Sequence, residues 1–433
     1  MSDNRNILAD CQAGDLAGKT ARIGLAVGLL GLAGGAALGY AGNDHERQTQ
    51  FWFAYLAAFF WMLTIGLGTM LFSLVAHLVG AHWSVTVRRL AEITQANLPI
   101  LCLFGLPLLY PLLTDDVTVW RWAHAGDAGH AAAEAGHAAP ADLGRQLAET
   151  EHHRLAAHKR PYLNVTFLLI RFAIYGCVWW LLSRYYFKGS VKQDTAADFA
   201  PTRRMRKWSA PSVIIFALTI TFASFDLLMS LDEAWFSTIF GVNIFAGAFM
   251  SCFAWLILAT KYLQSRGRMT QVVTAEHYHD LGKMMFAFTC FWGYTAFSQF
   301  MLMWYANMPE ETHWFKDRLS PAWLEWSWLL MFGHFLVPFL GLMSRHVKRH
   351  KFALPLWAGY MLLMHWVDMY WIVMPNMNPS PTAEHNPVGA MDLLLLVGMA
   401  GILVWATARR AAGQALVPVG DPLLDKCLAH KNV

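Results

Sequence analysis

Hydrophobic positions along this chain gather into long runs, separated by short polar segments. A helix needs roughly 20 apolar residues to cross the hydrocarbon core of a membrane, and runs of about this length recur throughout. Ten spans can be drawn, at 22–40, 52–79, 97–113, 162–186, 208–231, 237–262, 279–304, 319–343, 354–374 and 388–408. The pattern predicts an all-α polytopic membrane protein with about ten transmembrane helices.

The polar borders predict three parts: an N-tail at 1–21, a membrane domain at 22–408 and a C-tail at 409–433. The second and sixth spans are both long aromatic runs, which hints at a repeat. Two four-helix bundles, spans two to five and six to nine, would fit, flanked by spans one and ten. A long Ala-rich and His-rich segment at 114–160 interrupts the domain. We interpret it as a solvated cap or partner surface, with metal binding as the alternative.

Composition agrees with a membrane location. Charged residues make up only 14% of the chain, whereas AVILMFWYC reach 56%. Lysine and arginine concentrate in the tails and the even-numbered loops, which places both termini in the cytoplasm. The polar N-terminus does not resemble a cleaved signal peptide, so we expect the first span to be retained. Basic stretches at 203–207 and 345–351 predict contact with anionic lipid, with partner docking as the alternative.

Cysteine spacing bears on cofactors. The six cysteines include no C-x-x-C and no C-x-x-C-H motif. We therefore expect no covalent haem, iron-sulfur cluster or disulfide framework in this chain. We also expect no metal site, no catalytic residue and no nucleic-acid partner.

Candidate chemistry lies in the polar residues within the spans, because a charge at the bilayer centre costs at least roughly 2.5 to 3.5 kcal/mol. By depth, the outer half of the membrane should hold Asp226, Gln299, Glu325, His365, Asp368 and Asp392, with Arg171 somewhat deeper. The inner half should hold His77, His334, Asp280 and Lys283. Together with Glu233, these residues are our candidates for a proton path.

Helical spacing predicts that two groups of these candidates each lie on one helix face. Asp226, Ser230 and Glu233 follow intervals of four and three, so we expect them on one face leading outward. His365 and Asp368 also share a face, and they are the best local candidates for a quinone site.

Simpler structural explanations stand beside these. Arg171 would neutralise Asp226, Glu325 or Asp368 in an interhelical ion pair. Asp280 and Lys283 would form a helix cap with an interfacial ion pair, proton entry being the sharper alternative. A separate, cofactor-binding alternative is a haem b held between His334 on span eight and His365 on span nine.

Several long motifs carry a resemblance to a known family. SFDLLMSLDEAWFSTIFG at 224–241 and HYHDLGKMMFAFTCFWGYTAFSQFMLMWYANMPEE at 277–311 resemble the membrane subunits of bacterial alternative complex III. These subunits are relatives of the polysulfide reductase membrane subunit. FWFAYLAAFFWMLTIGLG at 51–68, WSVTVRRLAE at 83–92, RPYLNVTFLLIR at 160–171 and YWIVMPN at 370–376 look like the F subunit rather than its paralogue, the C subunit. The resemblance covers most of 51–408, but not the Ala/His-rich loop.

The resemblance implies a ten-helix subunit of the bacterial inner membrane, without a redox cofactor of its own. It would sit beside the C subunit, near extracytoplasmic subunits that carry haem c and iron-sulfur clusters. The complex would oxidise quinol and pass electrons to cytochrome c or to an associated terminal oxidase. The F subunit would contribute a proton route and a scaffold. Quinone binding by this chain itself is the alternative within the family.

Two other classes of protein stay open. A secondary transporter also shows membrane repeats and midplane carboxylates, but it favours helices that are broken at the binding site. Pro107 and Pro338 interrupt spans here without a paired glycine-rich unwinding. A purely structural scaffold would need no aligned acids. Co-purification of haem c subunits and single substitutions of Asp226, Glu325 and Asp368 separate these classes.

Overall fold

The computed structural model describes residues 10–114, 117, 119–123, 154–155, 157–377 and 388–432. Most of the long loop, including His124, His130, His137, His152 and His153, lies outside the described residues. Its assignment as a cap or partner surface therefore stays a prediction. Helices dominate the described part of the chain, and the only extended pairing there is an isolated bridge between Gln12 and Ala415. The prediction of an all-α membrane protein is confirmed.

The long helices follow the predicted order. Their bounds are α2 Asp15–Gly39, α3 His45–Val79, α4 Val85–Gln95, α5 Leu98–Leu103, α6 Tyr110–Leu113, α9 Val165–Gln193, α10 Ala200–Leu227, α11 Phe240–Ser265, α12 Ala275–Ala306, α14 Leu324–Leu329, α15 Val337–Met343, α17 Ala353–Val373 and α18 Ala390–Ala411. Short helices join or follow them: α13 Pro309–Arg318, α16 Arg345–Arg349 and α19 Leu424–Leu428. Single turns complete the set: η1 Ala41–Asn43, η2 Leu106–Leu109, η3 Arg121–Ala123, η4 Met229–Leu231 and η6 Met374–Asn376, with a π segment, η5, at Leu330–Leu336.

Within the described residues, 8 helices are long and apolar enough to cross a membrane. The helices α12 and α17, which coincide with the predicted spans seven and nine, are not among them. Tryptophan, tyrosine and polar side chains lower the mean hydropathy of both helices, and α17 also carries His365 and Asp368. The total of ten spans therefore stays a prediction.

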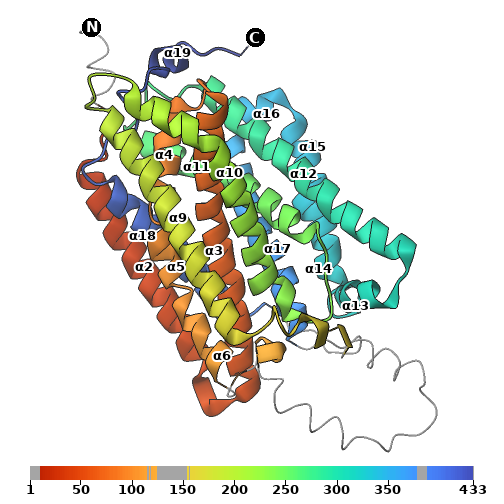
Figure 1. The fold of residues 1–433 in the computed structure, drawn as a ribbon. Helices are drawn as coiled ribbons and strands as arrows, with labels where there is room; N and C mark the ends of the chain where they lie inside the picture. The colour runs from red at the N-terminus through yellow and green to blue at the C-terminus, as the bar shows by residue number, and fades with distance from the viewer. Residues whose placement is uncertain are drawn as a thin grey trace, which may run out of the picture.

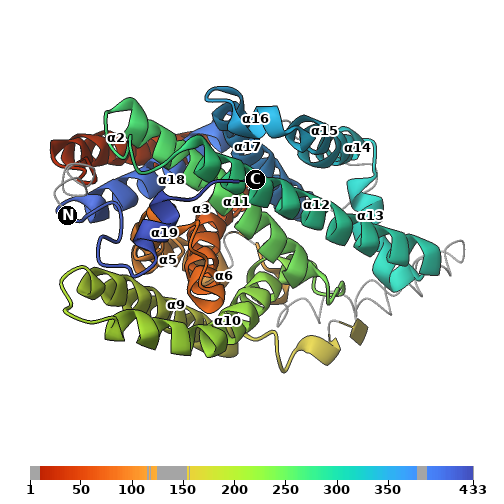
Figure 2. The same cartoon turned by 90° about the horizontal axis from the view of Figure 1, so that it is seen from above.

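The helices pack in groups around a central pair (Figures 1 and 2). The central helices α3 and α11 contact each other. On one side, α9 and α10 pack together, and α10 also packs on α3. On the other side, α12 and α17 pack on α11, and the segment α14–η5–α15 packs on both of them.

Helices α2 and α18 form a separate pair built on glycine. A Cβ added to Gly31 would lie 2.7 Å from the Cα of Gly398, and one added to Gly28 would lie 2.8 Å from Ile402 Cδ1. Glycine at such positions lets two backbones approach closely, which is how helices associate in lipid. Spans one and ten thus flank the bundle as an intimate helix pair.

The segments predicted to be cytoplasmic meet at one end of the bundle. The backbone of Cys11 accepts a hydrogen bond from Leu416 at 2.7 Å, and Asp10 accepts one from Met269 at 3.2 Å. The N-tail, the C-tail and the loop between α11 and α12 are therefore adjacent. At the opposite end, α13 meets the segment after α10, where His313 Nε2 lies 2.7 Å from Asp232 Oδ2 (Figure 1). The segments thus sort into two ends as the loop alternation predicts.

Span three is longer than predicted. The predicted loop before it contains the buried helix α4 at 85–95, and the candidate span runs over Val85–Leu113. Arg88, Arg89 and Glu92 interrupt the apolar pattern there, but both arginines pair with Glu92 inside the fold. The span is also irregular, since α5 ends at Leu103 and η2 and α6 follow around Pro107.

Candidate functional site

The clearest concentration of chemistry is a buried triad of His334, His365 and Asp368. Ligand-capable atoms of all three lie within 4.8 Å of one another. The two histidines are 0% exposed and the aspartate is 2% exposed. His334 belongs to the π segment η5, whereas the other two lie on α17. We call these three residues the triad.

Three further helices support the triad. Trp292 on α12 donates from Nε1 to Asp368 Oδ2 at 3.0 Å, and its ring lies 3.9 Å from that of His334. Thr64 on α3 is 2.8 Å from His365 Nε2. On α11, a Cβ at Gly247 would lie 3.0 Å from the His365 ring, so only glycine fits without displacement. A π turn places an extra residue in the helix and is often found at functional sites.

Thr64 links His365 to the backbone of α3. Its hydroxyl lies 2.9 Å from the Trp61 carbonyl and 2.8 Å from His365 Nε2. When the hydroxyl donates to the carbonyl, it accepts from His365 Nε2, and in that tautomer Nδ1 is an acceptor. Within the described residues, His365 Nδ1 and both nitrogens of His334 have no hydrogen-bond partner. These ring nitrogens are therefore open to water or to another small partner.

More buried polar side chains extend from the triad toward both ends. On α3, Ser73 and His77 follow Thr64 toward the end where the tails meet, and Gln299 on α12 lies two turns beyond Trp292 toward the other end. Ser73 Oγ and Gln299 Nε2 also lack hydrogen-bond partners among the residues described, whereas His77 Nε2 lies 3.6 Å from Glu92. Buried polar atoms of this kind are normally bonded to ordered water.

The depth assignment of His334 was wrong. We placed His334 in the inner half and His365 with Asp368 in the outer half, but the structure brings all three together. The π turn changes which side chains share a helix face, and a regular α-helical count cannot anticipate this.

Two further candidates, Glu325 and Glu233, lie away from the triad. Glu325 is exposed at the start of α14. Glu233 follows the end of α10 at Leu227 in a non-helical segment, so it does not continue the helical face of Asp226. The continuous face predicted from Asp226 to Glu233 is therefore wrong. Ser230 still contacts Asp226, because its hydroxyl donates to the Asp226 carbonyl at 2.5 Å.

Arg171 and Asp226 form an ion pair between α9 and α10. Arg171 Nε and Nη2 donate to the two carboxylate oxygens of Asp226 at 2.8 and 3.0 Å. Tyr175 adds a hydrogen bond to Asp226 at 2.6 Å, and the Tyr162 ring lies 3.9 Å from the Arg171 guanidinium. This arrangement matches the structural alternative for Arg171, and the pair is separate from the triad.

A charged network fixes the end where the tails meet. His77 Nε2 lies 3.6 Å from Glu92, which also accepts from Arg88 at 3.0 Å and from Arg89 at 3.2 Å. Arg88 also pairs with Asp421 of the C-tail. All of these groups are buried. The network locks the C-tail onto α4.

The remaining candidates have local partners. Asp280 pairs with Lys283 at 2.8 Å and with His430 of the C-tail at 2.7 Å, which fits the predicted ion pair. The predicted cap is wrong, because α12 begins at Ala275 and Thr274 caps it. Asp392 Oδ2 accepts from the Gly389 backbone at 2.9 Å and so caps the start of α18. Neither residue lies in the triad.

The triad can do more than one kind of chemistry. Two imidazoles and a carboxylate at this spacing are donors that a divalent metal accepts. Among the described residues, His365 Nδ1 and both nitrogens of His334 are open to a metal, whereas Trp292 already holds one carboxylate oxygen of Asp368. A haem between His334 and His365 would need space beside His334, where the Trp292 ring packs. Proton exchange needs only water and the atoms as they lie.

Sequence reasoning missed several supporting residues. Thr64 and Trp292 carry no local signal, because a threonine and a tryptophan in apolar helices are ordinary core residues. Arg88, Arg89 and Glu92 had a usable signal in their spacing of three and four residues, which allows pairing on one helix.

Comparisons with known proteins assign no family, since neither protein-family models nor curated proteins give a match to this chain. The resemblance to alternative complex III therefore remains a prediction.

Proposed function

We propose that this chain is a membrane subunit of a respiratory quinol oxidoreductase of the alternative complex III type, and that it carries protons rather than electrons. The proposal combines the resemblance of the long motifs with the triad. In this role the chain would bind no redox cofactor, and haem c and iron-sulfur clusters would belong to partner subunits. It would act in the inner membrane with both termini in the cytoplasm.

The observation that carries the proposal is the set of buried polar atoms without protein partners. Such atoms occur in several parts of the described chain, and one group of them lies at the triad and along α3 and α12 on either side of it. A structural role would favour fully satisfied groups, because an unsatisfied buried polar group costs roughly 1 to 3 kcal/mol. A water-linked proton route gives these atoms their partners.

Each triad residue has a defined task in such a route. His365 Nδ1 accepts a proton while Thr64 holds Nε2 in place. Asp368 is the neighbouring group that exchanges the proton, and Trp292 fixes its orientation. His334 is the third carrier and lies on a helix segment whose π geometry can rearrange.

Quinone binding at His365 and Asp368 is the weaker alternative. Both residues are buried, at 0% and 2% exposure, and five helical segments enclose them. A quinone headgroup would reach them only if these helices separated.

A secondary transporter is a second candidate, and one observation favours it. Span three breaks after Leu103, and span eight contains the π segment, so one helix is discontinuous and a second departs from regular α-helical geometry. Discontinuous helices are typical of transporter binding sites. The break in span three, however, contributes no residue to the triad, which belongs to α17 and η5.

Purification from the native membrane separates these functions. We expect a tagged chain to bring down subunits that stain for haem c, and the assembly to reduce cytochrome c with quinol. A chain that purifies alone, without haem, and binds a solute would contradict the respiratory role. Metal analysis of the same preparation tests the triad: a stoichiometric divalent ion would show a metal site in place of a proton carrier.

A further inference from the structure

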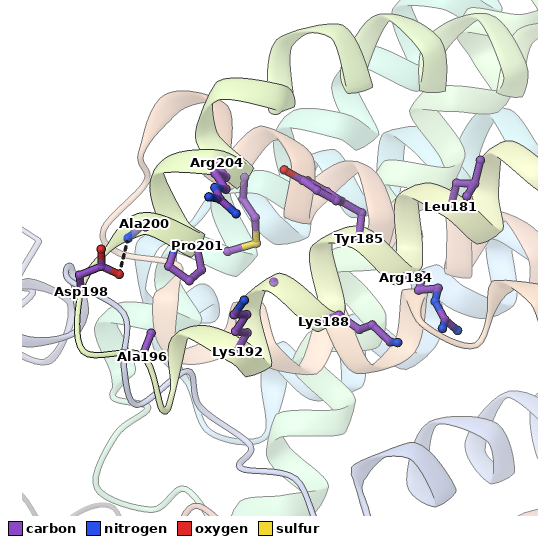
Figure 3. Close-up of a pocket in the computed structure, with 12 residues that line it drawn as sticks. Leu181, Arg184, Tyr185, Lys188, Lys192, Ala196, Asp198, Ala200, Pro201 and Arg204 are labelled. Carbon is purple, nitrogen blue, oxygen red and sulfur yellow. Dashed lines mark hydrogen bonds between the residues drawn. The ribbon is translucent and has the colours of Figure 1, made fainter.

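A pocket of about 550 Å³ lies between α9 and α10, at the end where the tails meet (Figure 3). Cavities of roughly 300 to 1,000 Å³ are typical of ligand sites. Four cationic side chains line this pocket: Arg184, Lys188 and Lys192 from α9, and Arg204 from α10. It is separate from the triad and plays no part in the proton route.

The three cations of α9 follow one another at intervals of four residues, so they stand on one helix face. Arg204 lines the same pocket from the start of α10 (Figure 3). No carboxylate of the described residues forms an ion pair with any of the four. The one acid in the lining, Asp198, accepts a hydrogen bond from the Ala200 backbone at 3.2 Å and lies 3.9 Å from Arg203. The pocket therefore holds an excess of positive charge.

The lining is also apolar below the charges. Leu181 precedes Arg184 by one turn toward the middle of α9 and is 51% exposed, and the Tyr185 side chain is 41% exposed. Met205 and Pro201 form the wall on α10. A free phosphate would use the cations but leave this apolar surface uncovered. A phospholipid would use both, with its headgroup among the cations and its acyl chains along α9.

We propose that this pocket binds an anionic phospholipid with two phosphates in its headgroup. Arg184 and Lys192 are eight residues apart, which corresponds to about 12 Å along the helix and exceeds the width of one phosphate. Basic pockets between helices on the cytoplasmic side are known sites for such headgroups. The lipid would join α9 to α10 at the end opposite the Arg171–Asp226 pair.

Native mass spectrometry of the purified full-length protein with added lipids tests this. The probes are diphosphatidylglycerol, phosphatidylglycerol and phosphatidylcholine, with inorganic phosphate as competitor. We expect the wild type to prefer diphosphatidylglycerol, and the K188Q/R204Q variant to lose about 25-fold in affinity, at about fivefold per cation. The control R203Q/K207Q removes the same charge from residues outside the lining and should stay within about twofold.

Three outcomes would overturn the proposal. Equal loss in the two variants would show a non-specific attraction to surface charge. Full competition by millimolar inorganic phosphate would identify a free-anion site. A partner protein that covers the pocket in the native assembly, with no lipid retained, would identify a protein interface. All four substituted side chains are exposed, so both variants should fold, and matching melting curves check this.

Discussion

Two buried polar groups in this protein, the Arg171–Asp226 pair and the triad, differ in how completely they are satisfied. The carboxylate of Asp226 receives two bonds from Arg171 and one from Tyr175. The triad has no cation other than its own histidines, and three of its ring nitrogens have no partner among the described residues. The first group is arranged to hold α9 against α10. The triad, with its open ring nitrogens, is arranged to exchange a small species with its surroundings, and a proton is the simplest candidate.

Breaking the ion pair should give the largest loss of stability. Arg171→Met leaves Asp226 buried and uncompensated, which costs about 3 to 5 kcal/mol. The double variant R171M/D226L removes both charges and should recover to within about 1 kcal/mol of wild type. Unfolding in mixed micelles measures both. If the double variant is as unstable as the single one, the pair does not act as a compensated unit.

The α2–α18 pair supplies a reference for packing without charge. A Cβ on Gly31 meets backbone atoms of Gly398 that cannot move aside, so Gly31→Ala should cost about 1 to 3 kcal/mol. Gly18 lies on the same helix with nothing within 4 Å, so Gly18→Ala should stabilise by about 0.5 to 1 kcal/mol. The same unfolding assay compares the two variants. Equal effects at both positions would contradict close contact between the helices.

Removing the ionisable group of the triad should change stability least among these core variants. Asp368→Asn keeps an acceptor for the Trp292 indole, so we expect a change below about 1 kcal/mol. A loss as large as that of Arg171→Met would mean that the triad is a structural element. This result would remove the difference between the two groups.

The smallest effect concerns pH at the end that holds α13. Burial lowers the pKa of His313, but the hydrogen bond and the charge of Asp232 outweigh it and hold the pKa above its ordinary value of 6.5. The stabilisation is therefore complete below pH 6.5 and is lost as the pH rises through the folded-state pKa. The protection of α13 amides, measured as the intrinsic exchange rate divided by the observed rate, should fall over that range in wild type and stay constant in H313Q. Protection that rises with pH would give the opposite sign.

Much of the architecture could be predicted because hydropathy and charge act locally. The order of the spans and the sorting of loops into two ends follow from apolar runs and basic loops. Helix α4 could not be predicted in this way, since Arg88 is compensated by Asp421, which lies far along the sequence. The convergence of His334 with His365 depends on a π turn and on Trp292, which periodicity does not encode. Glu325 lies outside the triad, because depth along the chain does not say which way a side chain points.

The most direct test of the account is the number of protons moved per electron by the assembled complex in sealed vesicles. Asp368→Asn is compared with Glu325→Gln, which removes an acid outside the triad. We expect a lowered ratio in the first variant with quinol oxidation retained under uncoupled conditions, and a wild-type ratio in the second. An unchanged ratio in an assembled Asp368→Asn complex would contradict the claim that the triad carries protons.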